Sequence, residues 1–184
     1  TGVQTCALPI SFTAANWHTA QTVTVTGVDD ALDDGDIIYH IVTAPATSAD
    51  SNYANVDPAD VTVTNTDNDA SGITVSAISG NTTEAGGTAT FTVVLTAQPT
   101  ANVTIGLSSE DTTEGTVNPA SLTFTTANWH TAQTVTVTGV DDALDDGDVV
   151  YHIVTAPATS ADSNYANVDP ADRKSTRLNS SHRT

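Results

Sequence analysis

Apolar and polar residues alternate along short segments of this chain, with a period of two. Residues 22–26 and 61–64 place valine on one face and threonine on the other, which is the pattern of a half-buried β-strand. Similar segments predict strands at 73–75, 90–95, 103–107, 122–124, 135–137 and 149–154. Glycine, asparagine, aspartate and proline fill the intervals, and no segment has the 3.6-residue period of a helix. We therefore expect an all-β fold.

A long segment of the sequence occurs twice, almost unchanged. Residues 11–60 recur as residues 123–172, so that Trp17 corresponds to Trp129, 112 positions later. Four positions differ: Ser11, Ala14, Ile37 and Ile38 become Thr123, Thr126, Val149 and Val150. A period this long is a whole domain, because solenoid units have about 20–50 residues. About seven short strands in each period favour tandem immunoglobulin-like antiparallel β-sandwich repeats, with a closed barrel as the alternative.

The two ends of the chain are related through the genetic code. Residues 7–10 can be written GCT CTT CCG ATC, whose reverse complement encodes residues 172–175. Residues 1–6 can be written so that their reverse complement encodes residues 176–181. This inverted repeat predicts that residues 1–10 and 172–184 derive from a sequencing adapter. We then expect residues 11–69 to be the C-terminal half of a first repeat, and residues 70–171 to be a second repeat lacking its last strand.

The charge distribution changes once these ends are set apart. All four basic residues (Arg173, Lys174, Arg177 and Arg183) lie in the C-terminal segment, so residues 11–171 are acidic and carry no cationic side chain except histidine. Without a basic footprint we expect no nucleic-acid partner and no contact with an anionic membrane. The single cysteine, Cys6, lies in the N-terminal segment, so we expect neither a disulfide nor a cysteine metal site in the repeats.

Aspartates crowd into one loop of each repeat. The first loop contains Asp29, Asp30, Asp33, Asp34 and Asp36, and its copy contains Asp141, Asp142, Asp145, Asp146 and Asp148. So many anions repel one another unless a divalent cation lies among them, and Ca²⁺ accepts about 6–8 oxygen ligands in irregular geometry. Magnesium fits less well, and the spacing is not that of an EF-hand. Asp67, Asp69, Glu84 and Asp111 are further candidate ligands. The alternative is that these acidic loops are simply solvated turns.

The aromatic and histidine residues give little sign of catalysis. Trp17, Trp129, Tyr39 and Tyr151 lie in or beside predicted strands, which favours core packing over a platform that stacks on sugars. The histidines have no acidic or cysteine neighbour at ligand spacing. No nucleophile has a recognisable base, so we expect that the chain is not an enzyme.

Three features resemble the Calx-beta repeat, which is common in large bacterial surface proteins. They are the segment Glu84-Ala85-Gly86-Gly87, the acidic loop with its Gly-Asp end, and the closing Asp67-Asn68-Asp69. The resemblance implies calcium at one end of the sandwich, near the next domain. Carried across, the ligands in the second repeat are Glu84, Asp111, Asp141, Asp142, Asp145, Asp146 and Asp148.

The expected function is therefore a calcium-binding structural or adhesive module. It would belong to a secreted or bacterial cell-surface protein, with neighbouring repeats and a cell-surface glycan or protein as its partners. The alternative is a carbohydrate- or ligand-binding accessory domain of a secreted enzyme.

Overall fold

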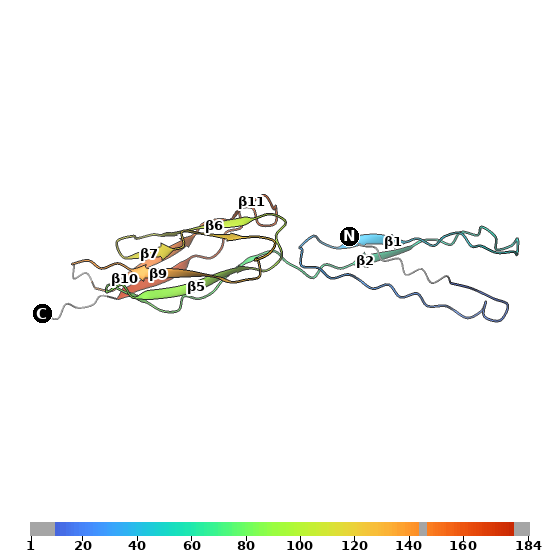
Figure 1. Cartoon of the computed structure of the whole chain (residues 1–184), viewed down its shortest axis with the longest axis horizontal. Helices are drawn as coiled ribbons and strands as arrows, with labels where there is room; N and C mark the ends of the chain where they lie inside the picture. Colours follow the sequence, from blue (N-terminus) through green and yellow to red (C-terminus); the bar gives the residue numbers. More distant parts are fainter. Residues whose placement is uncertain (1–9, 144–146, 179–184) are drawn as a thin grey trace.

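The computed structural model describes residues 10–143 and 147–178. Two units lie end to end in an elongated molecule (Figure 1), and every element in the described residues is a β-strand. The first unit consists of residues up to about Asp69, and the second begins at about Gly72. The all-β fold predicted from the alternation is confirmed.

The second unit is a sandwich of two sheets. One sheet contains β4 (Thr82–Thr83), β6 (Val103–Ser109), β8 (Ser121–Phe124), β10 (Val149–Thr155), β11 (Thr159–Ser160) and β12 (Arg173–Leu178). It has the order β11-β6-β10-β12-β4, with β8 also paired to β6. The other sheet has the order β3-β5-β9-β7, from β3 (Ile73–Val75), β5 (Thr88–Leu95), β7 (Gly115–Asn118) and β9 (Gln133–Gly139). All pairs are antiparallel except β12 with β4.

Alternate residues of both sheets form the core between them. Phe91 and Val93 of β5, Val135 of β9 and Ile105 of β6 are buried in one cluster, while the threonines between them are more exposed. Because side chains of a strand point alternately to opposite faces, the valine–threonine pattern fixes which face packs. The structure therefore packs the alternating strands as two facing sheets, a sandwich rather than the closed barrel that was the alternative.

The first unit is open by comparison. Its β1 (Ile37–Ile41) and β2 (Val61–Asn65) form a two-stranded antiparallel ribbon, and residues 10–36 run beside it as an extended segment (Figure 1). The strand predicted at 22–26 is wrong, because these residues have no strand assignment. Their copy is β9, which pairs with both β5 and β7. A strand needs such neighbours to form its hydrogen-bond ladder.

The last strand of the second unit corrects another expectation. Arg173–Leu178 forms β12, although the second repeat was expected to lack this strand. Its register repeats that of the first unit, since Val149 faces Arg177 as Ile37 faces Asn65. Ladder hydrogen bonds come from the backbone, so an unrelated sequence can complete the sheet when its inward side chains fit. The adapter origin of these residues stays a prediction.

Candidate functional site

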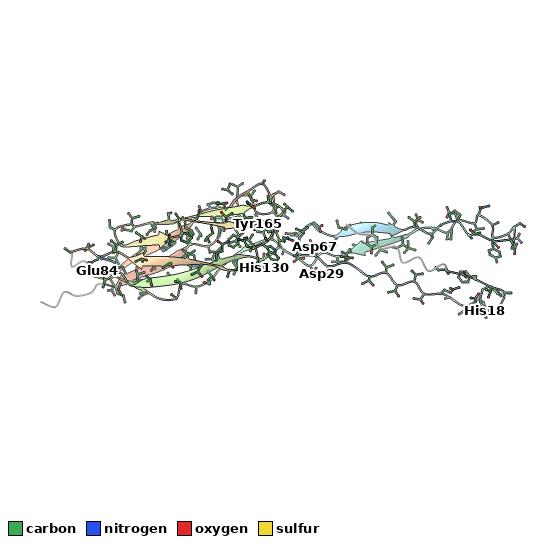
Figure 2. The ribbon with its side chains drawn as sticks, in the orientation of Figure 1. His18, Asp29, Asp67, Glu84, His130 and Tyr165 are labelled. Carbon is green, nitrogen blue, oxygen red and sulfur yellow. The ribbon has the colours of Figure 1, made fainter. Side chains whose placement is uncertain are left out.

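Carboxylates gather where the two units meet. The acidic loop of the first unit and its last residues supply five of them, which we call the junction cluster: Asp29, Asp30, Asp33, Asp67 and Asp69. Asp29 and Asp67 lie at the narrow connection between the units in Figure 2. The loop and the triplet are far apart in sequence, and the β1–β2 ribbon brings them together because the loop precedes β1 and the triplet follows β2.

Hydrogen bonds fold the acidic loop onto the closing triplet. Asp67 accepts from the backbone N–H of Gly35 at 2.7 Å and of Asp69 at 2.9 Å. The N–H of Asp67 donates in turn to Asp36 at 2.9 Å. Gly35 has a φ of 78°, a conformation that glycine adopts without steric cost. The loop is thus shaped by glycine and held by backbone donors.

Other hydrogen bonds cross from the first unit to the second. The backbone carbonyl of Ala31 accepts from the N–H of Gln98 at 2.7 Å. Asp33 accepts from the N–H of Ser71 through its carboxylate at 2.8 Å. The carbonyl of Asp33 also accepts from Asn164 Nδ2 at 2.7 Å. The acidic loop therefore contacts the near end of the next sandwich as well as its own ribbon.

The junction carboxylates differ in how their charge is stabilised. The backbone N–H groups of Asp69 and Gly35 lower the pKa of Asp67 below its ordinary value of 3.8. Loss of hydration raises the pKa of Asp69, and the negative charges of four neighbours raise it further: Asp67, Asp29, Asp30 and Asp33. Asp67 is thus stabilised as an anion by the backbone, whereas Asp69 lies in an excess of negative charge.

A second group of carboxylates lies at the opposite end of the second unit, near Glu84 in Figure 2. We call it the end cluster: Glu84, Asp111, Glu114 and Asp142, around Arg177. The arginine lies 3.2 Å from Glu84, 2.5 Å from Glu114 and 3.6 Å from Asp142. Its side chain is fully buried, and both glutamates are nearly so. Buried carboxylates require a cationic or hydrogen-bonding partner, and the guanidinium supplies it here.

Asp111 belongs to the end cluster because its carboxylate interacts with the charge of Arg177. Hydrogen bonds from Thr113 lower the pKa of Asp111, and the positive charge of Arg177 lowers it further. One guanidinium then faces four carboxylates, so the end cluster keeps an excess of negative charge.

The two clusters occupy equivalent places in their repeats. Asp30 corresponds to Asp142, and Asn65 corresponds to Arg177. Asn65 Nδ2 donates to the carbonyl of Val28 at 3.0 Å, and Arg177 donates to the equivalent carbonyl of Val140 at 3.3 Å. The arginine thus keeps the contact of the asparagine and extends a positive charge into the carboxylates.

The remaining predicted ligands lie in different surroundings. Asp34 and Asp36 are exposed on the first loop, and Asp141 and Asp148 are exposed on its copy. Asp145 and Asp146 lie outside the described residues. Within residues 10–143 and 147–178, no three acidic, histidine or cysteine side chains converge closely enough to hold a metal ion. The junction offers oxygen donors of the kind that calcium prefers, but several already accept backbone hydrogen bonds.

Sequence reasoning missed two residues of the end cluster and one residue that contacts the junction cluster. Glu114 was not a candidate, and glutamate alone is no signal for it, because Glu84 and Glu114 are buried whereas Glu110 is exposed. Arg177 was set aside with the predicted adapter segment. Asn164 gave no signal, because its contact with Asp33 depends on how the two units meet.

In the second unit, the aromatic residues pack in the core, and His152 lies in a surface ion pair. Trp129 packs against the core and Tyr151 is buried in it, as the packing interpretation predicts. The same prediction is wrong for Trp17, which is 69% exposed because the described part of the first unit has no second sheet to cover it. Tyr165, which was not among the predicted residues, is also buried in the core. His152 lies 2.8 Å from Glu110 on the surface, an acidic neighbour that sequence spacing did not reveal. This exposed pair is an ordinary surface ion pair when the imidazole is protonated.

Comparisons with known proteins assign no family to the chain. No protein family model matches the chain, and no curated protein matches it. Among solved structures, it is similar to SSP-19, an MSP-domain protein like family member of Caenorhabditis elegans, at 17% identity. That match covers 56% of this chain and 98% of the other, with a TM-score of 0.32, so it carries no argument. A search of the described residues for helices able to cross a bilayer found none.

Proposed function

We propose that this chain is a structural repeat module in which Ca²⁺ at the junction cluster holds successive units in line. The proposal includes a place in a secreted or cell-surface protein, an adhesive or stalk-like role rather than a catalytic one, and membership of the Calx-beta class that the motifs resemble. It rests on one observation: five aspartates lie together at the contact between the units, where the carboxylate of Asp33 accepts from the backbone N–H of Ser71.

The chemistry of the donors supports calcium at this place. All the side-chain donors are carboxylate oxygens, and no Lys or Arg occurs in residues 11–171 to balance them. Asp29 and Asp69 would share a cation, since Asp30, Asp33 and Asp67 already accept backbone hydrogen bonds. The side chains would have to draw closer together to bind it, because no three of them converge closely enough in this structure. A bound ion would cancel the repulsion and tighten the loop between ribbon and sandwich.

The end cluster of this chain differs because Arg177 lies among its carboxylates. We propose that the guanidinium acts there as an attached cation, so that the second unit stays folded without metal. Calcium dependence is then a property of the junction. The position filled by Asn65 in the first unit has no positive charge, so the same carboxylates in a repeat closed by asparagine would require a free cation.

Calcium titration of the full chain tests the proposal. We expect Ca²⁺, but not the same concentration of Mg²⁺, to extend the molecule and narrow its distribution of sizes in small-angle X-ray scattering, and a chelator to reverse this. Asp29→Asn with Asp69→Asn should abolish the response. The matched control is Asp57→Asn with Asp169→Asn, which removes two exposed carboxylates elsewhere and should leave it intact. Indifference of the unmodified chain to Ca²⁺ would overturn the proposal.

A further inference from the structure

The first unit exposes a set of apolar side chains that its near-identical copy buries. We call this set the open face: Phe12, Trp17, Val23, Val25 and Tyr53. Their counterparts are Phe124, Trp129, Val135, Val137 and Tyr165, all of which lie in or against the core of the second unit. Val23 is 57% exposed and Val135 0%, and Tyr53 is 62% exposed and Tyr165 0%. Large apolar side chains that are exposed in one copy and buried in the other mark a place where another surface can pack.

The backbone of the first unit is open at the same place. In the second unit β10 pairs with β6, and β9 lies between β5 and β7. In the described part of the chain, β1 pairs with β2 alone, and residues 21–27 pair with no strand. Unpaired strand edges accept further strands by backbone hydrogen bonding. The open face therefore offers a sheet edge together with an apolar surface.

We propose that the open face binds one occupant: a half-repeat polypeptide with the sequence of residues 72–122, distinct from the copy that already packs in the second unit. The second unit shows the fit, because its own residues 72–122 cover the same side chains there. Tyr165 donates to the carbonyl of Ala97 at 2.6 Å and accepts from its N–H at 3.2 Å. Tyr53 is the same residue in the same local turn, so it can make the same pair of bonds.

The chain's own residues 72–122 cannot be the occupant, because they run in the wrong direction from the junction. In the second unit Ile73 pairs with Leu95, whose N–H bonds to the carbonyl of Trp129. A docked segment would therefore begin beside Trp17. The neighbouring His18 lies at the end of the molecule farthest from Glu84 (Figure 2), whereas Gly72 follows the junction. The chain's own segment starts at the wrong end, and it already packs with β9, β10 and β12.

Tryptophan fluorescence of the full chain can report docking at this face. The chain has two tryptophans, Trp17 and Trp129, and residues 72–122 contain none. In a Trp129→Phe chain, adding residues 72–122 fused to a soluble tryptophan-free carrier should shift the emission of Trp17 to shorter wavelength in a saturable way. The same fusion with Phe91→Asp, which places a charge in the packing face, should give no shift.

The measurements are made both with Ca²⁺ and with a chelator, because docking brings Glu84 and Glu114 of the occupant close to Asp30. Saturable docking in either condition supports the proposal. No shift in both conditions, or equal shifts with both fusions, would overturn it. A Trp17→Phe chain reports the second unit, and a shift there without one at Trp17 would mean that the added segment exchanges into the existing sandwich, which also contradicts the proposal.

A covalently linked variant removes the requirement that the separate half-repeat stay folded. When residues 72–122 are placed directly before Ser11 in the full chain, Trp17 should become as protected from a soluble quencher as Trp129, and residues 21–27 should gain amide protection. If Trp17 remains accessible even when the segment is covalently attached, the open face does not bind it. Neither result depends on the calcium response of the junction.

Discussion

The two copies of the long repeated segment adopt the same local structure in different surroundings. The turn at 13–19 has the same backbone hydrogen bonds as the turn at 125–131, and Asn55 and Asn167 have φ values of 60° and 63°. The ribbon β1–β2 has the register of β10–β12. Residues 21–27, in contrast, have no strand assignment, while the identical residues 133–139 form β9.

This comparison separates the local structure that a segment forms by itself from the structure that it forms only when neighbouring strands pair with it. Turns depend on contacts a few residues apart, so identical sequence gives identical turns. A strand is completed by partners elsewhere in the chain, and its preference is largely one for a half-buried, paired position. The side chains of the open face are exposed for the same reason: the described part of the first unit lacks the strands that cover their counterparts in the second.

The largest effect should come from a matched pair of core substitutions. Phe124→Ala removes a fully buried ring and should destabilise the second unit by about 3–5 kcal/mol. Phe12→Ala changes the same residue of the first unit, where the ring is 59% exposed, and should change stability by no more than about 0.5 kcal/mol. Denaturant unfolding followed by circular dichroism, which detects both units, measures both.

Equal effects of the two substitutions would contradict the structural difference between the units. Phe12→Ala would then have to remove packing that resembles the packing around Phe124. A useful addition is Phe12→Ala in the presence of the docked half-repeat, where its effect should approach that of Phe124→Ala.

An effect of similar size is expected where the two copies differ at their last strand. Arg177→Asn gives the second unit the residue that the first has as Asn65. It leaves Glu84 and Glu114 buried without the guanidinium, and removing one partner from a buried ion pair costs about 3–5 kcal/mol. Thermal unfolding of the variant and of the unmodified chain in a chelator measures the loss. Calcium should restore part of the lost stability if the carboxylates can share the ion.

The control for Arg177→Asn lies on the same strand. Arg173 donates to the backbone carbonyls of Val75 and Asp172, so Arg173→Asn should cost about 1 kcal/mol. Adding Glu84→Gln and Glu114→Gln to Arg177→Asn should recover stability, since neutral amides need no counter-charge. If Arg177→Asn and Arg173→Asn are equally mild, the guanidinium is not what keeps the glutamates buried.

The sequence predicted most strands and the place of the carboxylates, and it failed where structure depends on distant contacts. The strand at 73–75 is as predicted, and those at 90–95 and 103–107 were predicted slightly short. The error at 22–26 came from reading alternation as sufficient for a strand. The short strands β4, β7 and β11 have no clear alternation, because their pairing comes from the sheet they join.

In the candidate site, too, some features could be predicted from the sequence and others depend on distant contacts. Crowded aspartates and the closing triplet were visible in the sequence, and the structure brings Asp29, Asp30 and Asp33 beside Asp67 and Asp69. The role of Arg177 could not be read, because a segment predicted to be foreign was not expected to supply a buried residue. Calcium binding itself stays a prediction.

A smaller effect is expected on the stability of the junction, where two aspartate substitutions should act in opposite directions and depend on pH. The pKa of Asp69 is raised in the folded chain, so its contribution to stability is present below the ordinary value of 3.8 and is lost as pH rises through the folded pKa. The pKa of Asp67 is lowered, so its contribution is present above 3.8 and is lost as pH falls through its folded pKa. At neutral pH in a chelator, Asp69→Asn should therefore stabilise the junction and Asp67→Asn should destabilise it.

Amide hydrogen exchange at Gly35 and Ser71 can follow both variants, because their N–H groups bond to junction carboxylates. Exchange should slow in Asp69→Asn and accelerate in Asp67→Asn at neutral pH, and both differences should shrink in acid. Changes of the same sign in the two variants would show that the junction does not distinguish these carboxylates.

The smallest effect expected concerns a single hydrogen bond between the units, and the repeat supplies its own control. Asn164 Nδ2 donates to the carbonyl of Asp33 across the junction at 2.7 Å, whereas Asn52, the same residue of the first unit, donates to Asp50 in its own loop at 3.1 Å. Asn164→Ala should weaken the contact between the units by about 1 kcal/mol or less and broaden the scattering size distribution. It should leave the unfolding of the sandwich unchanged, because its backbone bond to Asp162 remains. Asn52→Ala should change neither quantity. A broader distribution in both variants would mean that the loop conformation, rather than the bond across the junction, aligns the two units.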